Sequence, residues 1–420
     1  MEKHSVGLLA PALEGTITGE HTVMQKEKNR TIFSGILSVP ADDIVVSLLL
    51  ISIILGVYTA GAAVVLTALY AIINPRTKAL MAKSPMLNAT LFIFPLVMLP
   101  AVFTCFKYYF LNVRPSISQI AFNRCFLCGV FICLIFVVLL YLLTTMTKER
   151  FSRMTDIVLA ISMISSVCGL FERITQDSDR VSFIYSNPNL YGYCIELFSL
   201  IALYKFVESK RLLYLVIFAA NVGSIVLCDC RTAWPALFVS IAVMAVYKKK
   251  KARYIAIAVV LAIIFAVIVF SAPEIFPRFA YKSINSSFIK RMDMWYNSIR
   301  FISRNPIIGY GTGSYLLLST ASPDVRTLMH AHNLFLNILL DFGIIGAAAF
   351  INFFLRLYQK MFNATQRIKL GNIGMLVAGA FSATLIHGFT DVVMLSTSTS
   401  LLFVLVISGV AAASNTTVDR

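Results

Sequence analysis

The sequence predicts an all-α polytopic membrane protein with about twelve transmembrane helices and one large loop outside the cytoplasm. Hydrophobic residues make up 58% of the 420 residues and charged residues only 13%. The apolar residues gather in runs near the ~20 residues that cross the ~30 Å hydrocarbon core of a bilayer. A basic, largely irregular stretch from Ser271 to Asn333 interrupts these runs. A water-soluble protein is excluded by this composition.

The expected spans follow one another along the chain. A first apolar run, 44–73, is too long for one ordinary span, and Gly56 and Gly61 predict a tight turn near Tyr58 that divides it into two short helices. The later spans are expected near residues 91–111, 122–143, 155–171, 188–206, 212–228, 232–247, 252–271, 342–358, 372–388 and 392–413.

Positive charge predicts the orientation of these spans. With two spans in 44–73, every short basic loop lies on the cytoplasmic side, as the positive-inside rule requires, and both termini lie there as well. A single span in 44–73 keeps this orientation only if the N-terminus is outside, which gives eleven spans. The loops that decide this contain Arg76, Lys78 and Lys83; Lys148, Arg150 and Arg153; Lys210 and Arg211; Lys248–Lys251 and Arg253; and Arg356, Lys360, Arg367 and Lys369.

This topology divides the chain into five parts. Residues 1–43 are expected to be a mobile cytoplasmic extension, because they lack the basic start and apolar core of a signal peptide. Residues 44–271 hold the first nine helices, 272–341 the large outer loop, 342–413 the last three helices and 414–420 a cytoplasmic tail. The formal charge of +16 is assigned to topology and anionic lipid headgroups, so no nucleic-acid partner is expected.

The large loop is expected to contain an amphipathic helix along the outer membrane surface. Apolar residues recur there at helical spacing, and charged residues occupy the positions between them. From 272 to 332 the loop has seven Lys or Arg and three acidic residues, an excess that favours an anionic ligand. The apolar set is Phe288, Met292, Trp295, Ile299 and Ile302.

His330 and His332, which end this loop, are the best general-base candidates, because a histidine can remove a proton near neutral pH. Their spacing also suits a metal ion, but the sequence offers no clear third ligand. Asp177 and Asp179 form a DxD pattern that many glycosyltransferases use for a divalent ion, but two acids at this spacing arise often by chance, and a solvated loop is the favoured explanation. No metal or cofactor is therefore expected.

Arg180, Arg231 and Arg291 are expected at the outer membrane boundary, where a charge is costly unless it is paired or functional. A guanidinium group binds two oxygens of a pyrophosphate and neutralises the charge that grows on a departing phosphate. The alternative for each is an interface anchor or an ion pair, such as Arg231 with Asp229.

Four segments together resemble the superfamily of bacterial O-antigen ligases and O-antigen polymerases, over roughly residues 180–390. In its most specific part, His332-Asn333 is followed nine residues later by Gly343-Ile344-Ile345-Gly346, which looks like the His-Asn and Gly-x-x-Gly of the ligase motif. The other segments are Asn305–Gly313, which is similar to the family's Asn-Pro-x-x-Gly-x-Gly turn, Arg231-Thr232-Ala233 after Cys230 in place of a serine, and Asn187-Pro188-Asn189.

The resemblance implies a glycosyltransferase of the bacterial cytoplasmic (inner) membrane with its active site on the outer face. It implies an undecaprenyl-pyrophosphate-linked glycan as donor, a glycan or lipid A core sugar as acceptor, inversion at the anomeric carbon, and membrane lipids as surroundings. His332 is then the catalytic histidine beside His330, and Arg231 and Arg291 bind the pyrophosphate. Arg180 and Asn333 complete the expected substrate contacts.

The acceptor stays open at this point. Repeat-unit polymerase and O-antigen ligase both fit, with Asn187-Pro188-Asn189 favouring the polymerase, and a protein O-oligosaccharyltransferase is a further member of the class. A flippase or transporter of lipid-linked glycans also has many spans. Transporters usually keep their charges near the middle of the membrane on broken helices, whereas here the charges gather in one outer loop.

Overall fold

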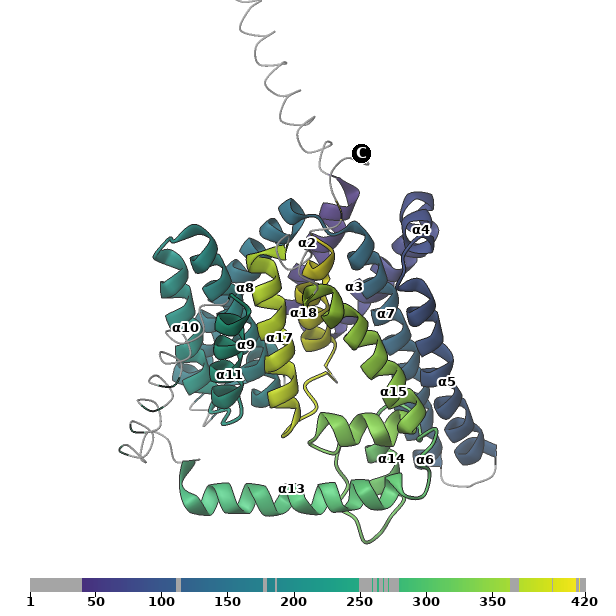
Figure 1. Ribbon diagram of the computed structural model, residues 1–420. Helices are drawn as coiled ribbons and strands as arrows, with labels where there is room; N and C mark the ends of the chain where they lie inside the picture. Colours follow the sequence, from purple (N-terminus) through teal and green to yellow (C-terminus); the bar gives the residue numbers. More distant parts are fainter. Residues whose placement is uncertain are drawn as a thin grey trace, which may run out of the picture. The chain divides into compact units, whose positions relative to one another are not determined.

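Every regular element in the described part of the chain is a helix, as the sequence predicts (Figure 1). The computed structural model describes residues 40–110, 115–176, 180–185, 187–248, 279–362, 370–394 and 396–412, with single positions 259, 263, 267, 271 and 415. The chain divides into two units, residues 1–46 and 47–420. The extension before residue 40, Asp177, Asp179 and most of the expected span 252–271 lie outside the described residues.

The helices follow the predicted apolar runs closely. They are α2 (Ala41–Ile54), α3 (Val57–Ile73), α4 (Pro75–Ala82), α5 (Leu87–Phe110), α6 (Pro115–Ile120), a π-helix (Ala121–Leu127), α7 (Cys128–Thr145), α8 (Lys148–Thr175), α9 (Pro188–Ser209), α10 (Leu213–Cys228), α11 (Ala233–Tyr247), α13 (Tyr281–Ile302), α14 (Ser314–Thr320), α15 (Leu334–Phe362), α17 (Asn372–Gly388) and α18 (Thr397–Ile407). The run 44–73 divides at Gly56, whose φ of 109° ends α2 and begins α3, as its glycine predicts.

Five of the described helices are long and apolar enough to cross a membrane, and a sixth span arises if α3 and α4, bent by 83°, are counted as one. The five segments are Leu87–Tyr108, Ser116–Thr145, Lys148–Thr175, Pro188–Ser209 and Leu334–Gln359. Four further apolar helices are shorter, including α10, α11 and α17. The number twelve therefore stays a prediction.

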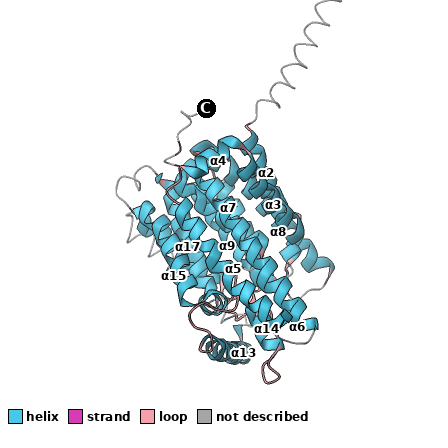
Figure 2. Ribbon diagram, turned by 90° about the vertical axis from the view of Figure 1, so that its right-hand side faces the viewer, coloured by secondary structure: helices cyan, strands magenta, loops and turns pink. Residues whose placement is uncertain are grey.

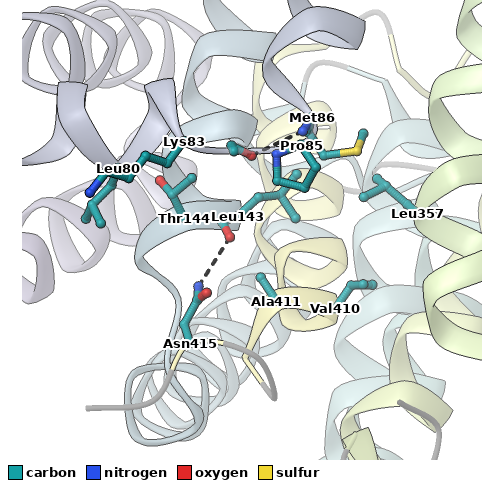
Figure 3. Close-up of a pocket in the computed structure, with 11 residues that line it drawn as sticks. Leu80, Lys83, Pro85, Met86, Leu143, Thr144, Leu357, Val410, Ala411 and Asn415 are labelled. Carbon is teal, nitrogen blue, oxygen red and sulfur yellow. Dashed lines mark hydrogen bonds between the residues drawn. The ribbon is translucent and has the colours of Figure 1, made fainter. Parts of the chain in front are cut away.

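Helix α13 lies across one end of the helices of residues 47–420, and α4 lies at the other end (Figures 1 and 2). A cavity of about 340 Å³ opens near α4 between α4, α7, α15 and the segment after α18 (Figure 3). Its apolar lining includes Leu80, Met86, Leu143, Leu357 and Val410. This cavity is at the end remote from α13 and has no part in the polar cluster described below.

The outer loop is more regular than expected, and the helix that follows it begins earlier. Helix α15 starts at Leu334 instead of near residue 342. The side-chain Oδ1 of Asn333 accepts hydrogen bonds from the backbone N–H groups of Phe335 and Leu336, both at 3.0 Å, and so caps the helix. His330 and His332 consequently lie directly before a helix N-terminus.

Two glycines bring the turn 305–313 against a break in α15. Gly309 and Gly343 both have positive φ, 73° and 63°. Backbone hydrogen bonds join the two segments: Tyr310 N to Leu340 O, Gly311 N to Asp341 O, Ile344 N to Pro306 O and Ile345 N to Ile307 O. A Cβ on Gly343 would meet Ile307 O at 2.2 Å, so only glycine permits this approach.

The amphipathic helix is present as α13, and one side of it packs against the rest of the protein while most of the predicted apolar set stays exposed. Met294, Ser298 and Phe301 are buried, with Phe301 packing against Tyr315 of α14. Phe288, Met292 and Ile299 of the predicted apolar set are 55%, 45% and 57% exposed. Period alone does not distinguish these two neighbouring apolar faces, and contacts with α14 and α15 decide which one is buried.

Replacing Gly343 should destabilise the protein strongly. Gly343→Ala places an alanine at a positive φ that L-residues rarely adopt, and its Cβ would clash with Ile307 O. We expect a loss of about 3 kcal/mol in the free energy of unfolding. Gly223→Ala is the matched control, because its Cβ would meet nothing within 4 Å on α10. Thermal unfolding of the two purified variants in detergent compares them, and equal melting temperatures would contradict the packing argument.

Candidate active site

A short loop after α17, Phe389-Thr390-Asp391, is where the candidate residues meet. We refer to it as the 389–391 loop. Asn333 donates from Nδ2 to Phe389 O at 3.1 Å, and Arg291 donates from Nε to Thr390 O at 3.1 Å. Thr232, beside Arg231, is hydrogen-bonded to Thr390 through their hydroxyl groups at 2.5 Å. Segments more than 150 residues apart in the sequence therefore converge at the α13 end of the helices.

The two predicted histidines face one buried carboxylate in this loop. Asp391 is 2% exposed, and its Oδ1 lies 3.3 Å from His332 Nδ1 and 3.6 Å from His330 Nε2. The two imidazole rings are 4.2 Å apart between centroids. His332 is the more accessible, with 25% of its side chain exposed against 13% for His330.

Hydrogen bonding indicates which ring nitrogens carry protons. The backbone N–H of His332 donates to Nδ1 of His330 at 3.2 Å, so neutral His330 has its proton on Nε2, toward Asp391. The Nδ1 of His332 is buried, and its partner among the described residues is Asp391 Oδ1, at a geometry that is poor for a hydrogen bond. A proton on this nitrogen faces the Asp391 carboxylate at 3.3 Å, which leaves Nε2 of His332 as a proton acceptor.

Burial and charge fix the ionisation of two of these groups. Burial lowers the pKa of His330 to about 4, against the raising effect of Asp391, so His330 is neutral at neutral pH. Burial alone would raise the pKa of Asp391. Three neighbours together lower this pKa well below its usual range: His332 by hydrogen bonding and charge, His330 by charge, and Asn189 by a hydrogen bond. Asp391 is therefore an ionised acceptor at neutral pH.

His330, His332 and Asp391 are also the one group among the described residues whose donor atoms, all within 4.8 Å of each other, suit a metal ion. Asp391 is the third ligand that the sequence did not reveal. The hydrogen bonds do not fit a resident metal. To coordinate a metal, Nε2 of His330 would have to lose its proton to Nδ1, but Nδ1 already accepts a hydrogen bond from the backbone N–H of His332. The arrangement suits proton transfer instead.

Two of the predicted arginines reach this site from different elements. Arg231, in the turn between α10 and α11, donates from Nη2 to Ser287 Oγ of α13 at 2.7 Å. Arg291 of α13 is bonded to Thr390, next to Asp391. Both are half-buried, and Arg231 is linked to the 389–391 loop through its neighbour Thr232, which is hydrogen-bonded to Thr390. Such a pair can bind an anion beside a proton acceptor.

Arg180 and Asn333, also predicted as substrate ligands, make contacts within the protein. Arg180 donates to Asn189 Oδ1 at 2.8 Å and, at the end of α10, to Cys228 O at 3.2 Å and Asp229 O at 3.4 Å. Asn333 is 7% exposed, and its amide caps α15 and holds Phe389 O. The amide of Asn333 is thus occupied by backbone groups.

A comparison with known protein families decides which superfamily the central segment resembles. Residues 213–351 match the O-antigen ligase family. This confirms the resemblance to the O-antigen ligase and polymerase superfamily. No curated protein matches the chain. The O-antigen ligase segment contains Arg231, Arg291, His330, His332 and Asn333, whereas Asp391 and Arg180 lie outside it.

Both histidines of the O-antigen ligase segment face Asp391, which was not among the residues predicted for the site. Asp391 follows an expected span, 372–388, directly at its outer end, and an ionisable residue at such a boundary is a functional signal. Deeper in the protein, His387 Nδ1 lies 2.6 Å from Glu196 Oε1, with both side chains fully buried, and this pair joins α17 to α9. It fixes the helix that carries the 389–391 loop.

Asp391→Asn should reduce glycan transfer by roughly 10²- to 10⁴-fold while the protein still accumulates in the membrane. An amide in place of the carboxylate neither holds the proton on His332 Nδ1 nor stabilises an imidazolium. Initial rates of the purified variant, compared with membrane protein on an immunoblot, test this. Activity within twofold of wild type would remove Asp391 from the site.

His330→Gln should leave the acidic limb of the pH–rate profile unchanged. Since the pKa of His330 is lowered to about 4, the ring gains a proton only below that pH, and its neutral form is the one present from pH 5 upward. Glutamine is neutral throughout. A shift of the acidic limb in the variant would assign that limb to His330.

Proposed function

We propose that this protein is a membrane glycosyltransferase that transfers a glycan from undecaprenyl pyrophosphate to an acceptor hydroxyl, with inversion, during assembly of a cell-surface polysaccharide. The O-antigen ligase segment and the apolar helices support a membrane role in polysaccharide assembly. One observation carries the reaction type: His332 faces the buried Asp391 carboxylate, one residue from the Thr390 carbonyl that Arg291 binds.

His332 acts as the general base in this proposal. Its Nε2 removes the proton of the acceptor hydroxyl, and the Asp391 carboxylate stabilises the imidazolium that forms. The acceptor oxygen bonds to the anomeric carbon from the face opposite the phosphate. The bond between that carbon and the phosphate oxygen breaks, and undecaprenyl pyrophosphate leaves with the electron pair. His330, neutral beside His332, restricts the position of that ring.

Arg231 and Arg291 bind the pyrophosphate of the donor. Negative charge grows on the phosphate oxygen as the glycosidic bond breaks, and guanidinium groups held by Ser287 and Thr390 need no large rearrangement to stabilise it. The leaving group already carries two phosphates, so the chemistry does not require a metal ion.

The charges at the two ends of the protein support the proposed membrane placement. Short basic segments such as Lys148–Arg153 and Lys210-Arg211 adjoin the helix ends remote from the site, which supports a cytoplasmic side there and a site on the outer face of the bacterial inner membrane. A lipid-linked glycan flippase is the alternative. The location of the histidines and arginines at the helix ends, instead of mid-membrane, favours the transferase.

Replacing the proposed base should abolish transfer. In a strain deleted for this gene, His332→Ala should reproduce the deletion phenotype on a surface-glycan gel, with normal protein in the membrane, whereas His21→Ala of the N-terminal extension should complement. Collapse of a ladder to single repeats identifies a polymerase, and a full ladder stranded on the lipid carrier identifies a ligase. An unchanged gel profile would favour transport or protein glycosylation.

Chelation should leave the reaction intact. Because the His330 tautomer opposes metal binding, we expect EDTA to change the initial rate of glycan transfer by less than about twofold. Loss of activity that magnesium or manganese restores would contradict this and would favour Asp177 and Asp179, or the His330–His332–Asp391 group, as metal ligands.

A further inference from the structure

Asn189 joins Arg180 to the proposed catalytic centre. It lies in the first turn of α9, after Pro188, and its backbone N–H donates to Asn187 Oδ1 at 2.8 Å. Its side-chain Oδ1 accepts from Arg180 at 2.8 Å, and its Nδ2 donates to Asp391 Oδ2 at 2.6 Å. One amide therefore links a guanidinium group to the buried carboxylate.

The partners of Asn189 fix the direction of its amide. A guanidinium group can only donate hydrogen bonds, and an ionised carboxylate can only accept them. The amide oxygen must face Arg180 and the amide nitrogen must face Asp391. Without Arg180, the amide loses the partner that opposes a flip, and a flipped amide would place its oxygen against a carboxylate oxygen.

The amide in turn fixes the rotation of the carboxylate. Asp391 Oδ2 is taken by Asn189, and Oδ1 accepts from Val392 N at 2.8 Å and faces both histidines. A carboxylate held at both oxygens presents Oδ1 to His332 in one orientation. General-base catalysis depends on that orientation, because it keeps the proton on Nδ1 and leaves Nε2 to act.

Two further hydrogen bonds of Arg180 go to backbone carbonyl groups. Its Nε and Nη2 donate to Cys228 O and Asp229 O, at the C-terminal end of α10, where a cation is favoured. This location contrasts with that of Arg231 and Arg291, which are bonded to Ser287 and Thr390 beside the proposed pyrophosphate site.

We infer that Arg180 and Asn189 are positioning residues that orient the Asp391 carboxylate toward His332, and that Arg180 is not a ligand of the donor pyrophosphate. This inference rests on the proposed function. It assigns the three arginines two different roles, which kinetics and binding can separate.

The test compares Arg180→Ala with Arg231→Ala and Arg291→Ala in the purified full-length protein. Undecaprenyl pyrophosphate is the binding probe. Arg180→Ala should bind it within about twofold of wild type and lose about 10- to 100-fold in kcat, whereas Arg231→Ala and Arg291→Ala should bind it at least about 10-fold more weakly. Arg180→Lys should recover part of the rate, because one ammonium can still donate to Asn189.

A double-mutant cycle separates positioning from a general loss of stability. Asn189→Ser should lower kcat as Arg180→Ala does, but should add less than about twofold to the loss caused by Asp391→Asn, because Asn189 acts through that carboxylate. Asn221→Ala is the matched control: Asn221 is buried on α10 and hydrogen-bonded to Ser162 and Ser166 of α8, which are not among the hydrogen-bond partners of Asp391, so its effect should add in full. Asn189→Ser also carries the test if Arg180→Ala does not accumulate.

The outcomes are distinguishable. Weak binding of the probe by Arg180→Ala, or full additivity of Asn189→Ser with Asp391→Asn, overturns the positioning role and leaves the proposed function standing. An unchanged kcat in Arg180→Ala does the same. Failure of the wild-type protein to bind undecaprenyl pyrophosphate overturns the proposed function, and this inference with it.

Discussion

The buried carboxylate of Asp391 is the constraint on which the arrangement of the site depends. The Asp391 side chain is only 2% exposed, and a charge buried in this way is tolerated only if hydrogen bonds and opposite charge compensate its lost hydration. Asn189, the N–H of Val392, and the two histidines supply that compensation from three separate parts of the chain. Satisfying one carboxylate therefore brings α9, the segment before α15 and the end of α17 to one point.

Two further sets of contacts hold these parts in place. The approach of Gly309 to Gly343 ties the turn 305–313 to α15 and so limits where His330 and His332 can lie. The buried pair of His387 and Glu196 ties the end of α17 to α9. Since both sets involve close or buried contacts, they form a rigid base under a site whose His332 ring stays partly accessible.

Much of the fold and part of the site were predictable from local signals. Apolar run lengths predicted the helices, and Gly56 predicted the division of the first run. The amphipathic helix and the His330–His332 pair were predicted from spacing. The start of α15 was predicted eight residues too late. Leu334–Asp341 is apolar, but the glycine break at Gly343 separates it from the rest of the helix. The cap by Asn333 depends on the direction of its side chain, which the sequence does not show.

The sequence by itself determined that the chain is a helical membrane protein, where its helices run, and which histidines and arginines are available, because these properties depend on composition and on spacing along the chain. Only the tertiary structure decided that Asp391 is the partner of both histidines, that Asn189 and Arg180 stand behind it, and which face of α13 is buried. Those contacts join residues up to 202 positions apart, and no local period or spacing encodes such a distance.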